Sequence, residues 1–303
     1  MDVAITGSTG LIGTALVERL GAAGHRAVRV VRGDATPGRD VVRWDPAAGT
    51  IDAAGLEGLD AVVHLAGAGI GDKRWTDERK RLILDSRVQG TTLLARTLAG
   101  LERRPAVLVS GSAVGYYGAH GDEALTEDAP PGDDFAAGVC TQWEAATVPA
   151  ADAGVRVVRI RTGIVLARHG GALARMVLPF SLGLGGRIKS GRQYMSWIAL
   201  DDEVDAIVHA ITHPEVDGPA NLTAPNPVTN AEFTKTLGRV LRRPTVLPTP
   251  LLPLKAVYGA ELVQHLLVEG QRVLPAKLEA TGFEHHHLQL EGALRAVLGK
   301  PAA

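Results

Sequence analysis

The sequence has a single cysteine, few aromatic residues and no excess of charge of either sign. Of its 303 residues only Cys140 carries a thiol, and aromatic residues make up 4%. One cysteine excludes an internal disulfide framework and is typical of a reducing compartment. Lysine and arginine number 32 against 33 for aspartate and glutamate, so we expect no nucleic-acid partner.

Long apolar runs are also missing. No uninterrupted apolar stretch reaches the roughly 18–20 residues that a membrane helix needs. The apolar start before Gly7 is too short for the core of a secretion signal. We therefore expect a cytoplasmic protein that does not span a membrane. Hydrophobic residues still make up 46% of the chain, which is enough for a large core.

Apolar runs of strand length alternate with segments of helical period in the first half. The runs predict strands at residues 3–5, 27–31, 41–44, 61–65, 107–110 and 155–160. Helices are predicted between them at residues 11–20, 77–101 and 134–153. This alternation predicts an α/β fold with a Rossmann-type, doubly wound parallel sheet.

Short stretches rich in glycine and proline replace this pattern after about residue 165. We assign residues 1–215 to a dinucleotide-binding domain with a substrate-side insertion at about 167–199. Residues 216–303 then form a mixed, mainly helical, substrate-side region. Helices are predicted at residues 201–212, 230–241, 251–267 and 290–298.

The segment ITGSTGLIG at residues 5–13 has the spacing of a phosphate-binding loop, and it stands between a predicted strand and a predicted helix. Its first glycine permits a tight turn, the second lets the backbone approach a pyrophosphate, and the third lets the helix pack closely. Free amides at the helix start would bind the phosphates. The predicted contacts are Gly7, Ser8, Thr9, Gly10, Leu11, Ile12 and Gly13.

The end of the second predicted strand indicates which dinucleotide binds. An NAD site normally has an acidic residue there for the ribose hydroxyl. This chain has Arg32, whose guanidinium suits a 2′-phosphate. We predict NADP as the cofactor. The alternative is a solvated Arg32 with Asp34 binding the ribose of NAD.

Motifs along nearly the whole chain resemble an atypical, epimerase-like branch of the extended short-chain dehydrogenase/reductase superfamily, which has a C-terminal domain of unknown function. The motifs stand at residues 5–13, 64–67, 71–75, 85–87, 110–118, 161–166, 183–186, 191–194, 197–198 and 269–271. The resemblance implies an NADP-binding Rossmann domain followed by a substrate-side region. The further candidate cofactor contacts are Leu65, Ala66, Gly67, Arg74, Arg87 and Ser110.

The chemistry that the resemblance implies is hydride transfer assisted by serine, tyrosine and a lysine four residues later. None of the four tyrosines is followed by that lysine, and Ala136 and Cys140 stand where the pair is expected. Only Ser112 matches a catalytic position. We therefore expect Ser112 with Tyr116 or Tyr117 to handle the substrate oxygen. The alternative is that both tyrosines are structural and Cys140 fills the core.

Several polar and aromatic residues are candidate substrate contacts, because they stand near strand ends where ligands collect. They are Lys73, Trp75, Arg192, Tyr194 and Trp197. Packing of Trp197 in an edge strand is the alternative. Consecutive histidines at residues 285–287 cannot readily converge on one ion, so we predict no metal site.

Two functions remain open. The first is an NADP-dependent oxidoreductase or epimerase-like enzyme of atypical mechanism, acting on a small polar or nucleotide-sugar-like substrate. The second is a catalytically impaired protein that binds and senses NADP(H). A structural cell-division factor is a weaker third hypothesis, which nothing in the composition supports. Helices that flank such a sheet often pair subunits, so a homodimer is compatible with the prediction.

Overall fold

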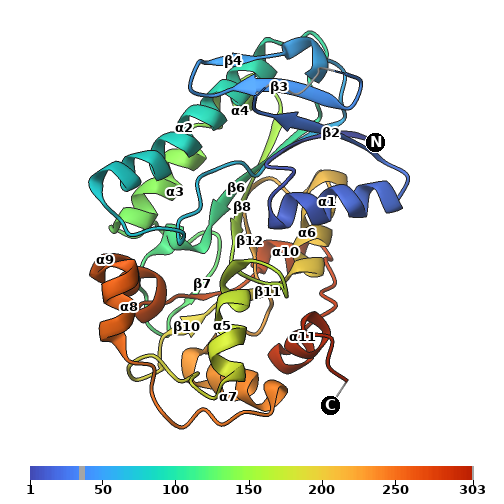
Figure 1. Ribbon diagram of the computed structural model, residues 1–303. Helices are drawn as coiled ribbons and strands as arrows, with labels where there is room; N and C mark the ends of the chain where they lie inside the picture. The colour runs from blue at the N-terminus through green and yellow to red at the C-terminus, as the bar shows by residue number, and fades with distance from the viewer. Residues whose placement is uncertain (34–37, 302–303) are drawn as a thin grey trace.

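A computed structural model describes residues 1–33 and 38–301 (Figure 1), so Asp34 lies outside the described residues. Eight strands form one sheet in the order β12-β8-β6-β5-β1-β2-β3-β4, in which only β3 and β4 are antiparallel. The strands are β1 (Asp2–Thr6), β2 (Arg26–Val31), β3 (Val41–Asp45), β4 (Thr50–Ile51), β5 (Ala61–His64), β6 (Val107–Ala113), β8 (Arg156–Thr162) and β12 (Gly218–Leu222). The predicted α/β fold with a Rossmann-type parallel sheet is confirmed.

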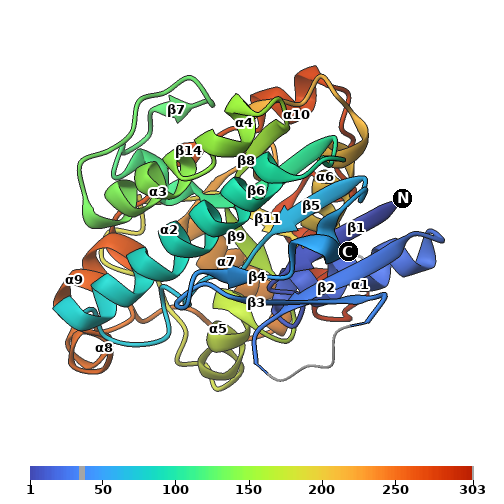
Figure 2. The ribbon, with the colours of Figure 1, turned by 90° about the horizontal axis from the view of Figure 1, so that it is seen from above.

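Helices cover both faces of the sheet. In β1, Val3 and Ile5 pack under α1 (Leu11–Ala22) and α6 (Leu200–Thr212), whereas Ala4 points to the other face. That face is covered by α2 (Asp77–Gly100) and α4 (Val148–Asp152), and α3 (Phe135–Ala145) lies beside α2 (Figure 2). Burial on both faces explains why the strands read as apolar runs.

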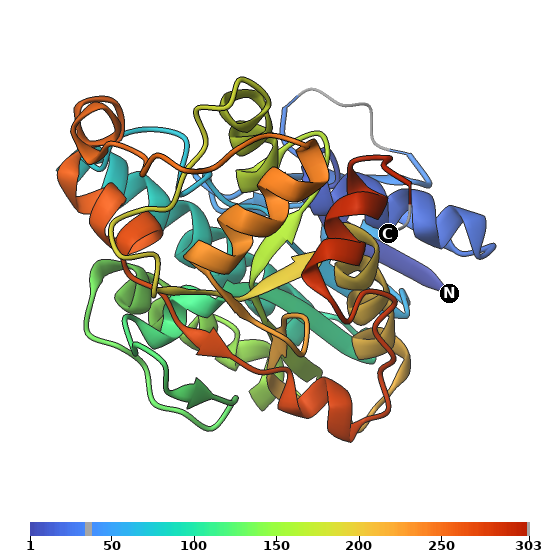
Figure 3. The same cartoon turned by 90° about the horizontal axis from the view of Figure 1, so that it is seen from below.

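Most of the other elements gather on one side of the sheet, below it in Figure 1, where β6 and β8 end, whereas η1 packs against α2 and β3. On that side of the sheet, α7 packs against both α5 and α11 (Figure 3), and none of the described helices is long and apolar enough to cross a membrane. The helical elements are η1 (Ala53–Leu56), η2 (Val114–Tyr117), α5 (Gly171–Ser181), α7 (Asn230–Leu241), α8 (Leu251–Tyr258), α9 (Ala260–Val263), the π-helix η3 (Gln264–Val268), α10 (Ala276–Ala280) and α11 (Leu290–Val297). Short strand pairs join β7 (Ala124–Leu125) to β14 (Arg272–Val273), β9 (Ile164–Leu166) to β11 (Trp197–Ala199) and β10 (Tyr194–Met195) to β13 (Val228–Thr229).

Two predicted helices are divided in the structure, and several elements, β4 and β12 of the central sheet among them, were not predicted. The helix predicted at residues 134–153 is split into α3 and α4, and Pro149 stands in the first turn of α4, where proline favours a helix start. The helix predicted at 251–267 is broken at Gly259, which has a φ of +89°. Strand β12 was missed because it contains Gly218 and Pro219, which an edge strand tolerates. The predicted boundary at 215/216 therefore falls just before a strand of the central sheet.

Candidate active site

The loop between β1 and α1 leaves no room for a side chain at Gly7 or Gly13. Gly7 has a φ of +66°, and a Cβ on it would lie 2.9 Å from the carbonyl carbon of Leu65. A Cβ on Gly13 would lie 2.2 Å from the carbonyl oxygen of Gly7. Gly10 is the N-cap of α1 and has no side chain to occupy the amides of the first turn. Those amides can donate hydrogen bonds to phosphate oxygens.

A buried threonine joins this loop to the one after β5. The hydroxyl of Thr6 accepts hydrogen bonds from the amides of Leu65 (3.1 Å) and Ala66 (3.2 Å) and lies 2.7 Å from Nδ1 of His64. Burial, helped by the charge of Arg87, lowers the pKa of His64 to about 4. Nδ1 of the neutral imidazole can therefore accept a hydrogen bond from the hydroxyl of Thr6. The bonds hold Leu65 and Ala66 against the glycine loop, where the resemblance places cofactor contacts.

An arginine of the second strand contacts the glycine loop, and another follows the strand directly, at the position where the adenosine ribose is expected. Arg29 donates from Nη1 to the carbonyl oxygen of Ser8 at 3.1 Å, and the exposed Arg32 directly follows β2. The side chain of Ser8 is buried, and no described residue hydrogen bonds to its hydroxyl. A buried, unpaired hydroxyl is costly unless a ligand completes it. The loop therefore fits a phosphate-bearing cofactor.

A buried ion pair stands beside Ser112 at the end of β6. The hydroxyl of Ser112 donates to Oε1 of Glu144 at 2.7 Å, and Arg161 binds both oxygens of that carboxylate at 2.8 and 3.0 Å. The side chains of Arg161 and Glu144 are only 3% and 8% exposed. Burial alone would lower the pKa of Arg161, but the hydrogen bond and charge of Glu144 raise it above its ordinary value. The arrangement holds the serine in one orientation.

The two candidate tyrosines have different environments. The hydroxyl of Tyr117 is fully buried, donates to Oδ1 of Asn221 at 2.6 Å and accepts from Arg161 at 2.9 Å. Burial raises the pKa of Tyr117 to about 12. Tyr116 is half-buried, and the guanidinium carbon of Arg161 lies 3.4 Å from its ring centre. Tyr117 is thus part of the buried network, whereas the side chain of Tyr116 stays partly exposed.

The residues at the tyrosine and lysine positions on α3 are both buried. Ala136 is 6% exposed and Cys140 is 5% exposed, with Sγ 3.8 Å from the carbonyl oxygen of Ala113. Burial, with the charge of Glu144, raises the pKa of Cys140 to about 11. The thiol therefore stays protonated near neutral pH. This environment is that of a core residue rather than of a reactive thiolate.

The outlying candidate cofactor contacts lie in three different places. Arg87 donates to the carbonyl oxygens of Ala68 (2.9 Å) and Ile83 (3.1 Å), so it supports the loop after β5. Ser110 is fully buried within β6. Arg74 donates to the carbonyl oxygen of Ala256 in α8 at 2.6 Å, which turns it toward the C-terminal helices.

The candidate substrate contacts divide into packed and exposed residues. Trp197 is fully buried and donates to the carbonyl oxygen of Asn226 at 3.1 Å, and Trp75, 7% exposed, donates to Ile70 at 2.9 Å. Both indoles are packed in hydrophobic clusters, which supports the structural reading of Trp197. Arg272 stacks on the half-buried ring of Tyr194. Lys73 and Arg192 are exposed.

Sequence reasoning missed the groups that complete the buried network and the loop. They are Thr6, Arg29, His64, Glu144, Arg161 and Asn221. One signal was available, because charged residues such as Arg161 within an apolar strand need a buried partner. The identity of that partner depends on the fold.

The parallel sheet and its amide-lined glycine loop define a dinucleotide-binding protein of the Rossmann type. Residues 3–222 match the NAD dependent epimerase/dehydratase family, and residues 249–297 match a domain of unknown function, DUF1731. The chain belongs to this epimerase/dehydratase family.

Relatives that span the whole chain agree with that assignment. An epimerase family protein of Mycobacterium tuberculosis is 46% identical over 299 residues, which cover 99% of this chain and 98% of the relative. The crystal structure of human epimerase family protein SDR39U1 with NADPH matches with a TM-score of 0.88 at 37% identity, covering 99% of both chains. A nucleoside-diphosphate sugar epimerase from Corynebacterium glutamicum matches with a TM-score of 0.82 at 39% identity, covering 99% of this chain and 58% of that one.

Proposed function

We propose that this chain binds NADPH and is an oxidoreductase or epimerase-like enzyme of atypical mechanism, acting on a small polar or nucleotide-sugar-like substrate. The observation that carries the proposal is the glycine loop, with free amides at the start of α1 and the unpaired hydroxyl of Ser8. Arg29 and Arg32 offer two guanidinium groups for the 2′-phosphate. NADPH bound to the human relative supports the choice of cofactor.

The chemistry that NADPH supplies when bound is a hydride for a carbonyl carbon. In our proposal the hydroxyl of Tyr116 donates the proton to the substrate oxygen, and the guanidinium of Arg161 over its ring stabilises the negative charge that remains. Ser112 donates to Glu144 in this structure, so in our proposal its hydroxyl turns from that carboxylate to donate to the substrate oxygen. Lys73 and Arg192 remain proposed contacts for an anionic substrate.

A binding protein that senses NADPH is the second candidate. One observation favours it: the proton of the Ser112 hydroxyl is already donated to Glu144, while Ala136 and Cys140 offer no acid or base in place of the missing pair. Such a protein would bind NADPH without consuming it.

Turnover separates the two candidates. NADPH absorbance is followed in the presence of a panel of aldehydes, ketones and nucleotide sugars. We expect at least one substrate to be reduced and Tyr116→Phe to lower kcat by about 10²–10⁴-fold with NADPH affinity kept. Tyr258→Phe, in α8, is the matched control and should retain activity. Absence of NADPH oxidation across the panel, together with no epimerised nucleotide sugar detected by chromatography, would contradict the enzyme and favour the sensor.

A further inference from the structure

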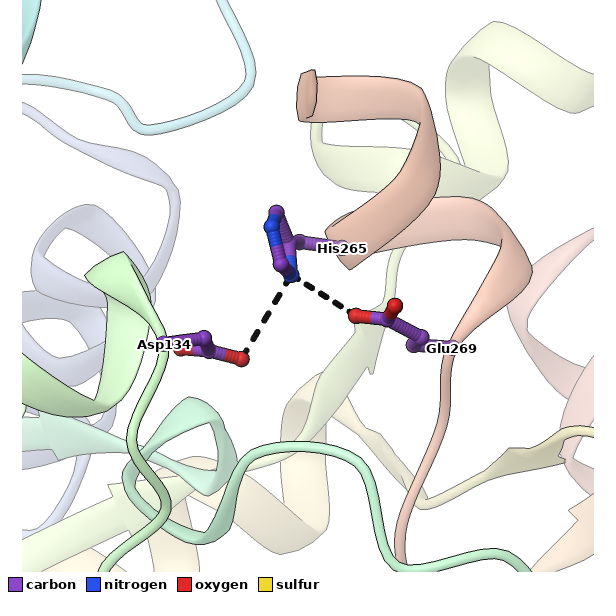
Figure 4. A group of neighbouring side chains, drawn as sticks. All are labelled: Asp134, His265 and Glu269. Atoms are coloured by element: carbon purple, nitrogen blue, oxygen red, sulfur yellow. Dashed lines mark ion pairs between the residues drawn. The ribbon is translucent and has the colours of Figure 1, made fainter. Parts of the chain in front are cut away.

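Three side chains that could ligate a metal ion meet between α3 and the C-terminal π-helix. Figure 4 shows Asp134 and Glu269 pointing at the ring of His265 from opposite sides. Nδ1 of His265 lies 3.6 Å from Oδ2 of Asp134 and 2.7 Å from Oε2 of Glu269. Ligand atoms that share one ion at bonds of about 2.1 Å lie roughly 3–4 Å apart. The distance to Asp134 lies in this range, the distance to Glu269 is shorter, and all three ligand atoms lie within 4.8 Å of one another.

The free oxygens of the two carboxylates are the ones that face the histidine. Oδ1 of Asp134 accepts the amide of Ala137 at 2.8 Å, and Oε1 of Glu269 accepts the side-chain amide of Gln264 at 2.7 Å. Such outer hydrogen bonds fix ligands in metal sites. The nearly parallel ring of Trp75, 6.1 Å away, limits the orientation of His265. The three groups are therefore held in place before any ion arrives.

Within the described residues 1–33 and 38–301, neither carboxylate of the cluster has a lysine or arginine as its partner. The side chains of Asp134 and Glu269 are only 16% and 25% exposed. Within the same residues, buried Nδ1 of His265 has no partner with hydrogen-bond geometry, although Oε2 of Glu269 is close. Two ligand atoms that bind the same ion also lie close together without a hydrogen bond between them.

A second group of this kind, Asp201, Asp202 and His287, differs in its bonding. Both carboxylate oxygens of Asp202 already accept backbone amides, from His286 at 2.7 Å and from His287 at 3.1 Å. That carboxylate organises a turn, so the group serves as an internal comparison.

We propose that Asp134, His265 and Glu269 bind one divalent transition-metal ion, for which Zn²⁺ is the probe. Two carboxylates and a neutral imidazole cancel the charge of such an ion, and histidine nitrogen with carboxylate oxygen is a donor set that zinc accepts. The ion joins the start of α3 to the π-helix, a helix type that is frequent at functional sites. The site does not depend on NADPH binding, and it departs from the expectation that the chain has no metal site.

The test uses the full chain, stripped of metal, titrated with Zn²⁺ in competition with a chromophoric chelator. We expect one ion per chain, with affinity lowered by about 100-fold or more in both His265→Gln and Glu269→Gln. His287→Gln should leave the affinity unchanged. Circular dichroism and NADPH binding show whether each variant is folded. Unchanged affinity in the folded His265 and Glu269 variants, loss in His287→Gln instead, or no bound zinc would overturn the proposal.

Discussion

Gly13→Ala is expected to weaken NADPH binding by about 100-fold or more, which corresponds to roughly 2.8 kcal/mol. The added Cβ would lie 2.2 Å from the carbonyl oxygen of Gly7 and 2.9 Å from Cα of Ser8, both of them backbone atoms that cannot rotate away. The loop must open, and the amides that would hold the pyrophosphate move with it. Fluorescence titration with NADPH measures the loss.

The matched control is Gly21→Ala in the same helix. Nothing lies within 4 Å of a Cβ at that position, so this variant should bind NADPH normally. It should also gain about 0.5–1 kcal/mol of stability from the better helix propensity of alanine. NADPH affinity of Gly13→Ala equal to that of the unmodified chain would contradict the assigned loop.

Glu144→Gln and Arg161→Met are each expected to lower the free energy of unfolding by about 3–5 kcal/mol. Each substitution leaves one member of a buried, doubly hydrogen-bonded ion pair without its partner. The loss at Arg161 also removes a donor to the hydroxyl of Tyr117. Chemical denaturation followed by circular dichroism gives the values.

The double variant Glu144→Gln/Arg161→Met distinguishes the contribution of the ion pair to stability from that of the packing around it. Because no lone charge remains buried, its cost should be clearly smaller than the sum of the two single costs. Additive costs, or single costs below about 1 kcal/mol, would show that the pair does not hold this end of the sheet.

Local sequence patterns were enough to predict much of the fold. The central strands could be predicted because burial on both faces makes them apolar throughout, as in Ala61–His64 of β5. The glycine loop was predictable because glycines at this spacing, between a strand and a helix, are typical of a phosphate-binding turn. Strand β12 escaped prediction because Gly218 and Pro219 are poor strand residues that only an edge position tolerates.

The site was harder to predict because its contacts join residues far apart in the chain. Glu144 lies on α3 and Arg161 on β8. Arg161 in an apolar strand indicates a buried partner, but the sequence does not show that this partner is Glu144. The same holds for Asp134 and His265, which meet only when the C-terminal π-helix packs near α3. Trp197 was chosen for its aromatic ring, but the same property places it in the core.

A side-by-side fluorescence titration of the full chain with NADPH and NADH, repeated with Arg32→Asp, tests whether the glycine loop and Arg32 bind NADPH. We predict tighter binding of NADPH by about tenfold or more, since a charge-assisted hydrogen bond to the 2′-phosphate contributes about 1.5–3 kcal/mol. The preference should collapse in Arg32→Asp and persist in Arg96→Asp, a charge reversal on an exposed position of α2. Equal affinity for both dinucleotides, or no binding of either, would contradict the account.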